Sequence, residues 1–381
     1  MPRATLPLST LLSHALVAYT IEFDNEFEER SPHIATVKRN VAARAGPWLV
    51  SQVMWTNFVR FVADGGTPVR ELQARAWLSD RIVKSRLHHL EWWSYLTITP
   101  DPSDMRTKPR YRDHLVHLTP GGRRARDEWR PLNAVIDKRW RERFGADVVD
   151  PLLASLRAIA SAAPAGLPDY LPVVDYGDGM RATLVAPDLV PAPPAEAADL
   201  DVSALLSRAL LVLTQEFEAE SNLSLTIAAN VLRVVDDGGT PQREIPLRAG
   251  VAKEGVSAAV NFLAKNGFVT VAPDKSKVVR ATKAGAAARD AYAPGLAQIE
   301  TRWASTFGAG TIATLRTSLE ALDQPAKGGG SLLAEGLQPH AGGWRAMKPY
   351  AEQTEAMLAD PRAALPHHPM VLHRGGYPDG A

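Results

Sequence analysis

The same pentapeptide occurs twice in this chain of 381 residues. Asp-Gly-Gly-Thr-Pro stands at residues 64–68 and again at 237–241, an offset of 173 residues. Each occurrence is followed, after one residue, by an Arg-Glu pair and an aliphatic residue. Repeats that stack into solenoids have periods of roughly 20–50 residues. A repeat of this length therefore indicates the duplication of a complete folding unit.

The similarity extends over most of each half, in the same order. The matching segments are 11–16 with 205–210, 95–98 with 268–271, and 139–140 with 302–303. Their offsets are 194, 173 and 163 residues, so the first copy is longer than the second at two places. The first change in offset, of 21 residues, indicates an insertion that we expect within 31–50, and the second indicates a loop longer by 10 residues between 101 and 117.

The length and the repeat together predict the domain organisation. A chain of 381 residues is expected to form two or three domains. The prediction is a first domain at 1–165, a Pro- and Ala-rich linker at 166–200, a second domain at 201–325 and a C-terminal extension at 326–381. A linker of that composition is semi-rigid.

The composition, with 45% hydrophobic and 22% charged residues, is typical of a soluble globular protein. The absence of cysteine excludes disulfides and thiolate metal sites. No apolar run reaches the roughly 18 residues that span a bilayer. The apolar stretch 6–21 is compatible with a signal peptide, but its counterpart lies in mid-chain, so we expect an amphipathic core helix. These observations predict a cytoplasmic protein without a membrane partner.

The net charge of +1 conceals an asymmetry between the halves. Through Ser161 there are 24 Lys and Arg residues against 18 Asp and Glu residues, whereas the remainder has 19 against 24. The first half is therefore the one suited to an acidic partner.

Hydrophobic spacing predicts the order of elements in the first copy. Glycines 65 and 66 are expected to end a helix, and Thr67 to cap the next one, with Pro68 at its first position. The expected elements are helices at 11–28, 48–62, 68–77 and 80–93, strands at 95–99 and 114–118, a long helix at 120–144 and a last helix at 148–160.

This order resembles the MarR family of transcriptional regulators: a short helix, a turn, a second helix and a two-stranded hairpin, with long helices at both ends. The residues that carry the resemblance are Asp113 and the run 114–122, in which a strand is followed by Leu-Thr and then glycine. The second copy keeps Thr282 and Gly285 but has Ala281 in place of leucine, and its hairpin is shorter. The resemblance covers about 11–160 and 205–322.

The resemblance implies a mainly α fold with small β-hairpin wings, built from two tandem winged helix-turn-helix domains. MarR-like chains usually dimerise through their terminal helices. One chain here carries both copies, so we expect an intrachain pseudo-dimer, either monomeric or assembled further into a homodimer.

The expected recognition helix directs Val83, Leu87 and Leu90 toward the core. Its outward residues are then the candidates for DNA contact: Arg81, Lys84, Ser85 and His88. Basic wing residues are further candidates, namely Arg106, Lys108, Arg110 and Arg112 in the first copy and Lys275, Lys277 and Arg280 in the second. The alternative for all of them is a solvated basic surface.

The outward positions of the second recognition helix are Glu254, Ser257, Ala258 and Asn261. Glu254 replaces Arg81, and a carboxylate is repelled by phosphates. The second copy therefore either binds a different half-site or has acquired a structural or ligand-binding role.

Two further groups of residues invite a binding role. Tyr19, Trp55 and Trp129 are candidates to line a pocket for a small aromatic effector, as the resemblance implies, with core packing as the alternative. His367, His368 and His373 lie close together, but no partner has the spacing of a metal site, so we expect no metal and an extended surface tail.

No nucleophile elbow, phosphate-binding loop or dinucleotide glycine pattern is present, so we expect neither an enzyme nor a cofactor. The function that the sequence predicts is a transcriptional regulator that binds double-stranded DNA mainly through its first copy. The alternative is a ligand- or protein-binding module on the same duplicated scaffold, which the near-zero net charge and the acidic second copy favour.

Overall fold

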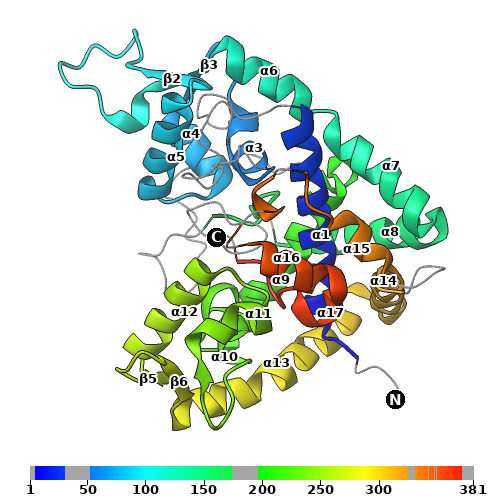
Figure 1. The fold of residues 1–381 in the computed structure, drawn as a ribbon. Coiled ribbons are helices and arrows are strands. Elements are labelled where there is room, and N and C mark those ends of the chain that lie inside the picture. Colours follow the sequence, from blue (N-terminus) through cyan, green and yellow to red (C-terminus); the bar gives the residue numbers. More distant parts are fainter. Residues whose placement is uncertain are drawn as a thin grey trace.

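The computed structural model describes residues 5–30, 52–164, 166–173, 196–324, 331–341, 343–346, 348 and 350–370. It is mostly helical, with two small antiparallel sheets (Figure 1). The predicted insertion and most of the predicted linker lie outside the described residues. None of the described helices combines the length and the apolar character needed to cross a membrane.

The first copy consists of seven described helices, two 3-10 turns and one sheet. The helices are α1 (Leu8–Arg30), α3 (Gln52–Asn57), α4 (Val69–Ala76), α5 (Asp80–Trp92), α6 (Pro120–Trp129), α7 (Leu132–Phe144) and α8 (Ala146–Ala162). The 3-10 turns are η1 (Val59–Phe61) and η2 (Tyr111–Asp113). The strands are β1 (Thr67–Pro68), β2 (Leu96–Thr99) and β3 (Leu115–Leu118), in the order β1-β3-β2.

The second copy repeats this arrangement. Its α-helices are α9 (Val202–Glu220), α10 (Asn230–Leu232), α11 (Ile245–Ala249), α12 (Lys253–Lys265), α13 (Lys283–Phe307) and α14 (Ala309–Leu322). A π-helical turn, η4 (Leu225–Ala229), precedes α10. The 3-10 turns are η3 (Ala197–Asp199) and η5 (Gln242–Glu244). The strands β4 (Thr240–Pro241), β5 (Val269–Val271) and β6 (Val278–Ala281) have the order β4-β6-β5. Thr67 pairs with Val116 as Thr240 pairs with Val279, so the two sheets share one register.

The repeated pentapeptide differs from its prediction in one respect. Thr67 does not cap a helix but begins the edge strand β1, and α4 starts only at Val69. The Thr67 hydroxyl accepts a hydrogen bond from the Ala63 amide (2.9 Å) and donates one to the Phe61 carbonyl (3.0 Å), which closes the preceding turn. Pro68, which has no amide hydrogen, is tolerated because an edge strand leaves that position unpaired. Gly66 has a φ of +93°, as the turn requires.

The sheet has three strands where a two-stranded hairpin was expected, because the two-residue strand β1 pairs with β3. The predicted cap at Thr119 is confirmed, since its hydroxyl accepts a hydrogen bond from the Gly122 amide at 3.1 Å. Gly122 must be glycine because a Cβ there would lie 2.0 Å from the Tyr95 carbonyl oxygen. At its counterpart Gly285, a Cβ would lie 1.9 Å from the Phe268 carbonyl oxygen.

The long helix predicted at 120–144 is divided into α6 and α7 at Arg130-Pro131. The second copy has one continuous helix, α13, despite Pro294. Within the described part of the helix predicted at 48–62, the structure has the short helix α3 and the 3-10 turn η1. Trp48 lies outside the described residues.

The first helix of each copy forms the centre of the molecule. α1 packs against α9, and α8 packs against α9 and α14, so the two copies share one hydrophobic core (Figure 1). The prediction of an amphipathic helix at 11–28 is wrong in one respect, because α1 is buried on all sides from Leu8 to Asp24. A helix that other helices enclose on every side has no solvated face to be polar.

The C-terminal extension forms α15 (Leu332–Gly336), the 3-10 turn η6 (Trp344–Ala346), α16 (Ala351–Ala359) and α17 (Pro361–Ala364). α15 packs on α1, whereas α16 and α17 pack on α11. The expectation of an extended surface tail is wrong for residues 365–370. Apart from the half-buried His367 these residues are buried, because their apolar side chains and prolines fill space between the copies. His373 lies outside the described residues.

Candidate nucleic-acid interface

Helix α5 presents a polar face that the sequence predicts correctly. It begins after Ser79, whose hydroxyl accepts a hydrogen bond from the Ile82 amide at 3.4 Å. The predicted core residues Val83, Leu87 and Leu90 are fully buried. Of the outward candidates, Arg81, Lys84 and His88 are exposed and Ser85 is half-buried. These side chains therefore lie on one accessible face of a helix that the core holds in place.

The base of the first wing lies close to this face. The Lys84 ammonium is 5.8 Å from the centroid of the Tyr111 ring, which belongs to η2 in the loop between β2 and β3. Such a cation–π contact is attractive. The contact between Lys84 and Tyr111 connects the outward face of α5 with the basic β2–β3 loop, so the candidate residues of the helix and those of the loop form one surface.

The four candidates in that loop are not equivalent. Lys108, Arg110 and Arg112 are exposed. Arg106 instead forms ion pairs with Asp104 and Asp113 within the loop. The Arg106 guanidinium lowers the pKa of Asp104 to about 2, so this carboxylate is charged and compensates Arg106 at neutral pH. Arg106 is therefore less available to phosphates than the other three.

The second copy presents a different face. Lys275, Lys277 and Arg280 are exposed around the shorter β5–β6 turn. On α12, Asn261 is exposed, whereas Glu254, Ser257 and Ala258 are half-buried. The candidate cations of this copy thus lie in the turn and on β6, and α12 has no cation at the positions of Arg81 and Lys84.

Figure 1 shows how these surfaces are arranged. α5 and α12 lie on the same side of the molecule, at the left of the view, with the β2–β3 loop at the upper end and β5 and β6 at the lower end. α1, α8 and α14 lie to the right of them, and α13 runs along the bottom of the view from beside β6 toward the right. An extended partner could therefore contact both sheets and both helices together.

Two exposed apolar side chains on the first copy were missed by sequence reasoning. Met105 in the basic loop is 92% exposed, and Trp92 at the end of α5 is 60% exposed. The sequence contained one indication that Met105 is exposed, because it is an apolar residue between Asp104 and Arg106 in a polar loop. Periodicity gave no corresponding signal for Trp92, since Trp93 beside it is buried.

The three candidate effector residues lie in the core. Trp55 stacks on Trp129 with ring centroids 6.4 Å apart and an interplanar angle of 25°. Tyr19 lies apart from this pair, edge-on to Trp140 at 5.3 Å. Tyr19 and Trp55 have no exposed surface and Trp129 is 9% exposed. Their arrangement is what core packing predicts, so they line no open surface.

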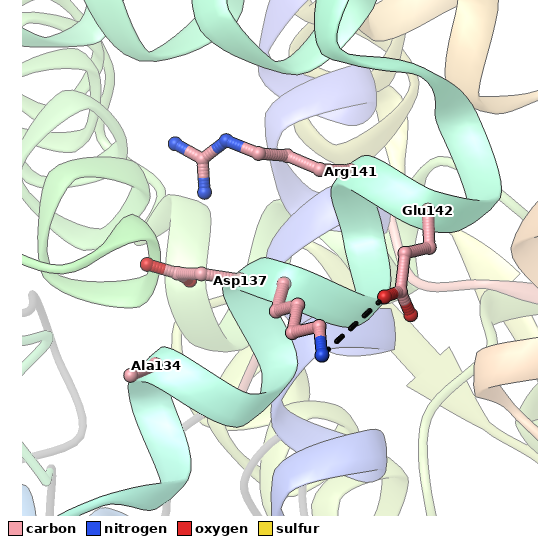
Figure 2. Close-up of a pocket in the computed structure, with 5 residues that line it drawn as sticks. Ala134, Asp137, Arg141 and Glu142 are labelled. Carbon is pink, nitrogen blue, oxygen red and sulfur yellow. Dashed lines mark ion pairs between the residues drawn. The ribbon is translucent and has the colours of Figure 1, made fainter.

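A hollow on the outer surface of α7 approaches Tyr19 from outside. It is lined by Ala134, Asp137, Lys138, Arg141 and Glu142 (Figure 2). The Tyr19 hydroxyl donates a hydrogen bond to Asp137 at 2.9 Å, and burial raises the pKa of Asp137 to about 6. Because all five lining residues belong to one helix, the hollow is open, and it provides no enclosed cavity for an aromatic molecule.

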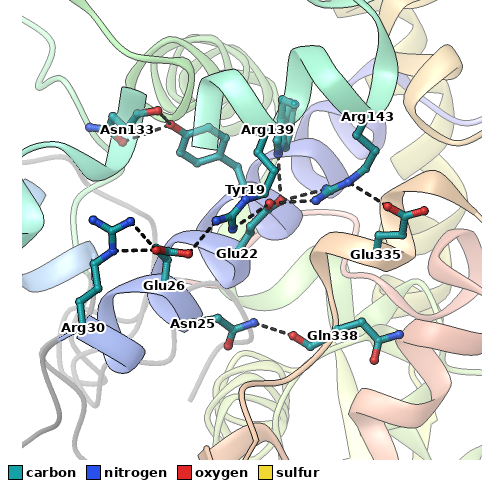
Figure 3. Close-up of polar contacts among 11 residues, drawn as sticks. Tyr19, Glu22, Asn25, Glu26, Arg30, Asn133, Arg139, Arg143, Glu335 and Gln338 are labelled. Carbon is teal, nitrogen blue, oxygen red and sulfur yellow. Dashed lines mark hydrogen bonds and ion pairs between the residues drawn. The ribbon is translucent and has the colours of Figure 1, made fainter. Parts of the chain in front are cut away.

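A cluster of charged side chains lies between α1 and α7 (Figure 3). Glu22, which is 4% exposed, accepts two hydrogen bonds of 2.9 Å from Arg143 and one of 3.2 Å from the Trp140 indole. Glu335 of α15 pairs with Arg143 from the other side at 3.3 Å. In the second copy Glu216 repeats the tryptophan contact with Trp303 (2.8 Å), and Arg302 pairs with it (3.3 Å) as Arg139 pairs with Glu22 (3.4 Å). The recurrence in both copies indicates a structural role.

Within the part of the chain that the structure describes, no group of three or more His, Cys, Asp or Glu side chains is placed to hold a metal ion. A comparison with family models, curated proteins and solved structures finds no match to this chain. A proposal about function therefore rests on the residues and geometry described above.

Proposed function

We propose that the protein is a transcriptional regulator that binds double-stranded DNA through two tandem winged helix-turn-helix domains. In each copy a short helix (α4 or α11), a second helix (α5 or α12) and a three-stranded sheet follow one another. The observation that carries the proposal is the face of α5, where Arg81, Lys84 and His88 are exposed beside a basic loop. A helix with such a face fits the major groove, and the loop fits phosphates or the minor groove.

The packing of the copies supports an intrachain pseudo-dimer. α1 and α9 lie side by side in the centre, and both sheets project toward one side of the molecule (Figure 1). A regulator with this arrangement would read two half-sites without a second chain. We also propose a cytoplasmic location, and a small aromatic effector would need a site other than Tyr19, Trp55 and Trp129, which line no open surface.

We assign most of the affinity to the first copy. Its helix has two cations where α12 has Glu254 and Ser257, and its wing is longer. The exposed Met105 beside Arg106 resembles the apolar wedges that enter between base steps in the minor groove. The second copy would contribute phosphate contacts through Lys275, Lys277 and Arg280.

The salt dependence of DNA binding tests this proposal. Roughly four phosphate contacts should give a decrease in affinity of about 100-fold between about 50 and 200 mM salt. Replacing Lys108, Arg110 and Arg112 together with alanine should reduce the salt slope by about three units and weaken binding to all sequences alike. Fluorescence anisotropy of a labelled duplex at several salt concentrations measures both quantities. Affinity that is independent of salt would contradict the proposal.

A second candidate function is ligand or protein binding without DNA. The pairing of Arg106 with two aspartates and the carboxylate on α12 favour it, because both reduce the positive potential toward a nucleic acid. Recovery of DNA bound to the protein from fragmented genomic DNA, at two salt concentrations, separates the two functions. Enrichment of a defined sequence supports the regulator, whereas its absence supports the alternative.

A further inference from the structure

Two segments outside the recognised repeats are equivalent to each other. Leu167-Pro168-Asp169-Tyr170 follows the first copy, and Leu365-Pro366-His367-His368 follows the second, at an offset of 198 residues. Each segment lies against the first helix of the other copy. Asp169 accepts a hydrogen bond of 2.8 Å from Arg208 of α9, and Ser13 of α1 donates one of 2.8 Å to the Pro366 carbonyl. The duplication therefore includes these segments, and the same site exists twice.

In the first of these sites a carboxylate lies between two guanidinium groups. Asp169 pairs with Arg60 at 2.7 Å and with Arg208 at 2.8 Å. All three side chains are largely buried, with exposures of 13%, 20% and 6% for Asp169, Arg60 and Arg208. The Asp169 carboxylate gives each guanidinium a direct counter-charge, and the three groups together keep one positive charge.

In the second site the carboxylate is absent. The residue that corresponds to Arg60 is Arg233, the one that corresponds to Arg208 is His14, and the one that corresponds to Asp169 is His367. Arg233 donates to the Asn230 side chain (3.1 Å) and the Ala249 carbonyl (3.4 Å), and no carboxylate of the described residues pairs with it. Burial lowers the pKa of Arg233 to about 10, so it keeps its charge at neutral pH.

Three polar atoms around this charge have no hydrogen-bond partner among the described residues. They are Nε2 of His14, Nδ1 of His367 and the hydroxyl of Tyr292. The His367 ring lies 6.4 Å from that of His14 and stacks on that of Tyr292 at 6.3 Å. His14 is 3% exposed and Tyr292 is 6% exposed. Buried polar atoms are nearly always satisfied in native proteins.

We propose that the cluster of Arg233, His14, His367 and Tyr292 is a binding site for a small monocarboxylate, which supplies to Arg233 the counter-charge that Asp169 supplies to Arg60 and Arg208 in the first copy. The ligand's negative charge compensates Arg233. The Arg233 guanidinium and the Tyr292 hydroxyl donate hydrogen bonds to its oxygens, and Nδ1 of His367 donates a third in the tautomer that carries its proton there. The half-buried Arg233 provides the approach from solvent. The deep burial of His14 and Tyr292 restricts the ligand to a small molecule.

Formate is a suitable probe because it consists of a carboxylate group and a single hydrogen atom. The melting temperature of the full chain at neutral pH should rise by about 2 °C or more when formate replaces chloride at constant ionic strength. Isothermal titration should show saturable binding of one formate per chain. Absence of saturable binding would overturn the proposal and would indicate that ordered water alone satisfies the three atoms.

Variants that copy the first site into the second sharpen the test. His367→Asp supplies an internal carboxylate, and the double change His14→Arg with His367→Asp reproduces the first site completely. Both should melt at a higher temperature than the unmodified chain and should not respond to formate. An unchanged response to formate in the folded double variant would place the ligand elsewhere and overturn the assignment.

Asp169→Ala provides the matched control. It removes the internal carboxylate from the first site and leaves Arg60 and Arg208 without it. Its melting temperature should fall, and formate should restore part of the loss. The site does not depend on DNA binding, so these outcomes are separate from those that test the regulator.

Discussion

Replacing Arg81 and Lys84 together with alanine is expected to reduce affinity for a specific duplex site by about 100-fold or more. Each side chain is exposed on α5, where a base-edge contact contributes about 1–3 kcal/mol. The loss should be largest for the specific site, because the wing cations remain to bind any duplex. Anisotropy titrations against the site recovered from genomic DNA and against an unrelated duplex measure both affinities.

The duplication provides the control for this experiment. Glu254 and Ser257 occupy the same positions in α12. Changing both to alanine alters the same two helix positions without removing a cation, so affinity should remain within a few-fold of the original or rise slightly. If the Arg81 and Lys84 variant keeps its specific affinity while its circular dichroism is unchanged, α5 is not the recognition helix.

Replacing Glu22 with alanine is expected to destabilise the protein by about 3–5 kcal/mol, which is the cost of leaving a buried charge without its partner. The change would leave the Trp140 indole without its acceptor and Arg143 with only the exposed Glu335 as its counter-charge. It would also loosen α15, because Gly336 lies next to the Glu22 carboxylate and Glu335 pairs with Arg143 (Figure 3). The midpoint of denaturant unfolding measures the effect.

Glu216→Ala is the matched comparison in the second copy. The Glu216 side chain is 31% exposed and its partner Arg302 is 41% exposed, so solvent screens the pair. We expect a loss of only about 1 kcal/mol there, chiefly from the Trp303 hydrogen bond. Equal losses in the two variants would show that burial of the Glu22 cluster does not determine its contribution.

Much of the local structure was predictable because it depends on residues close together in the chain. The burial of Val83, Leu87 and Leu90, and with it the outward face of α5, follows from helical spacing. The caps at Ser79 and Thr119 follow from hydroxyls that reach amides three residues ahead.

Features that depend on distant partners were not predictable in the same way. Strand β1 has only two residues and exists because β3, nearly 50 positions later, pairs with it. The pairing of Arg106 with Asp104 and Asp113 depends on how the loop returns to its base. The burial of residues 365–370 depends on the space between two copies whose relative placement no periodic pattern describes.

The sequence by itself determined that the chain is duplicated, where most helices of the first copy lie and which face of α5 is polar, because repetition and periodicity are properties of the chain. Only the tertiary structure decided that the segments at 167–170 and 365–368 occupy equivalent positions on opposite copies. His14, Arg233 and His367 are more than 130 residues apart in sequence, and packing alone places them in one cluster. Only the tertiary structure shows that the second site lacks a carboxylate, because a counter-charge is identified by its distance in space and not by its position in the sequence.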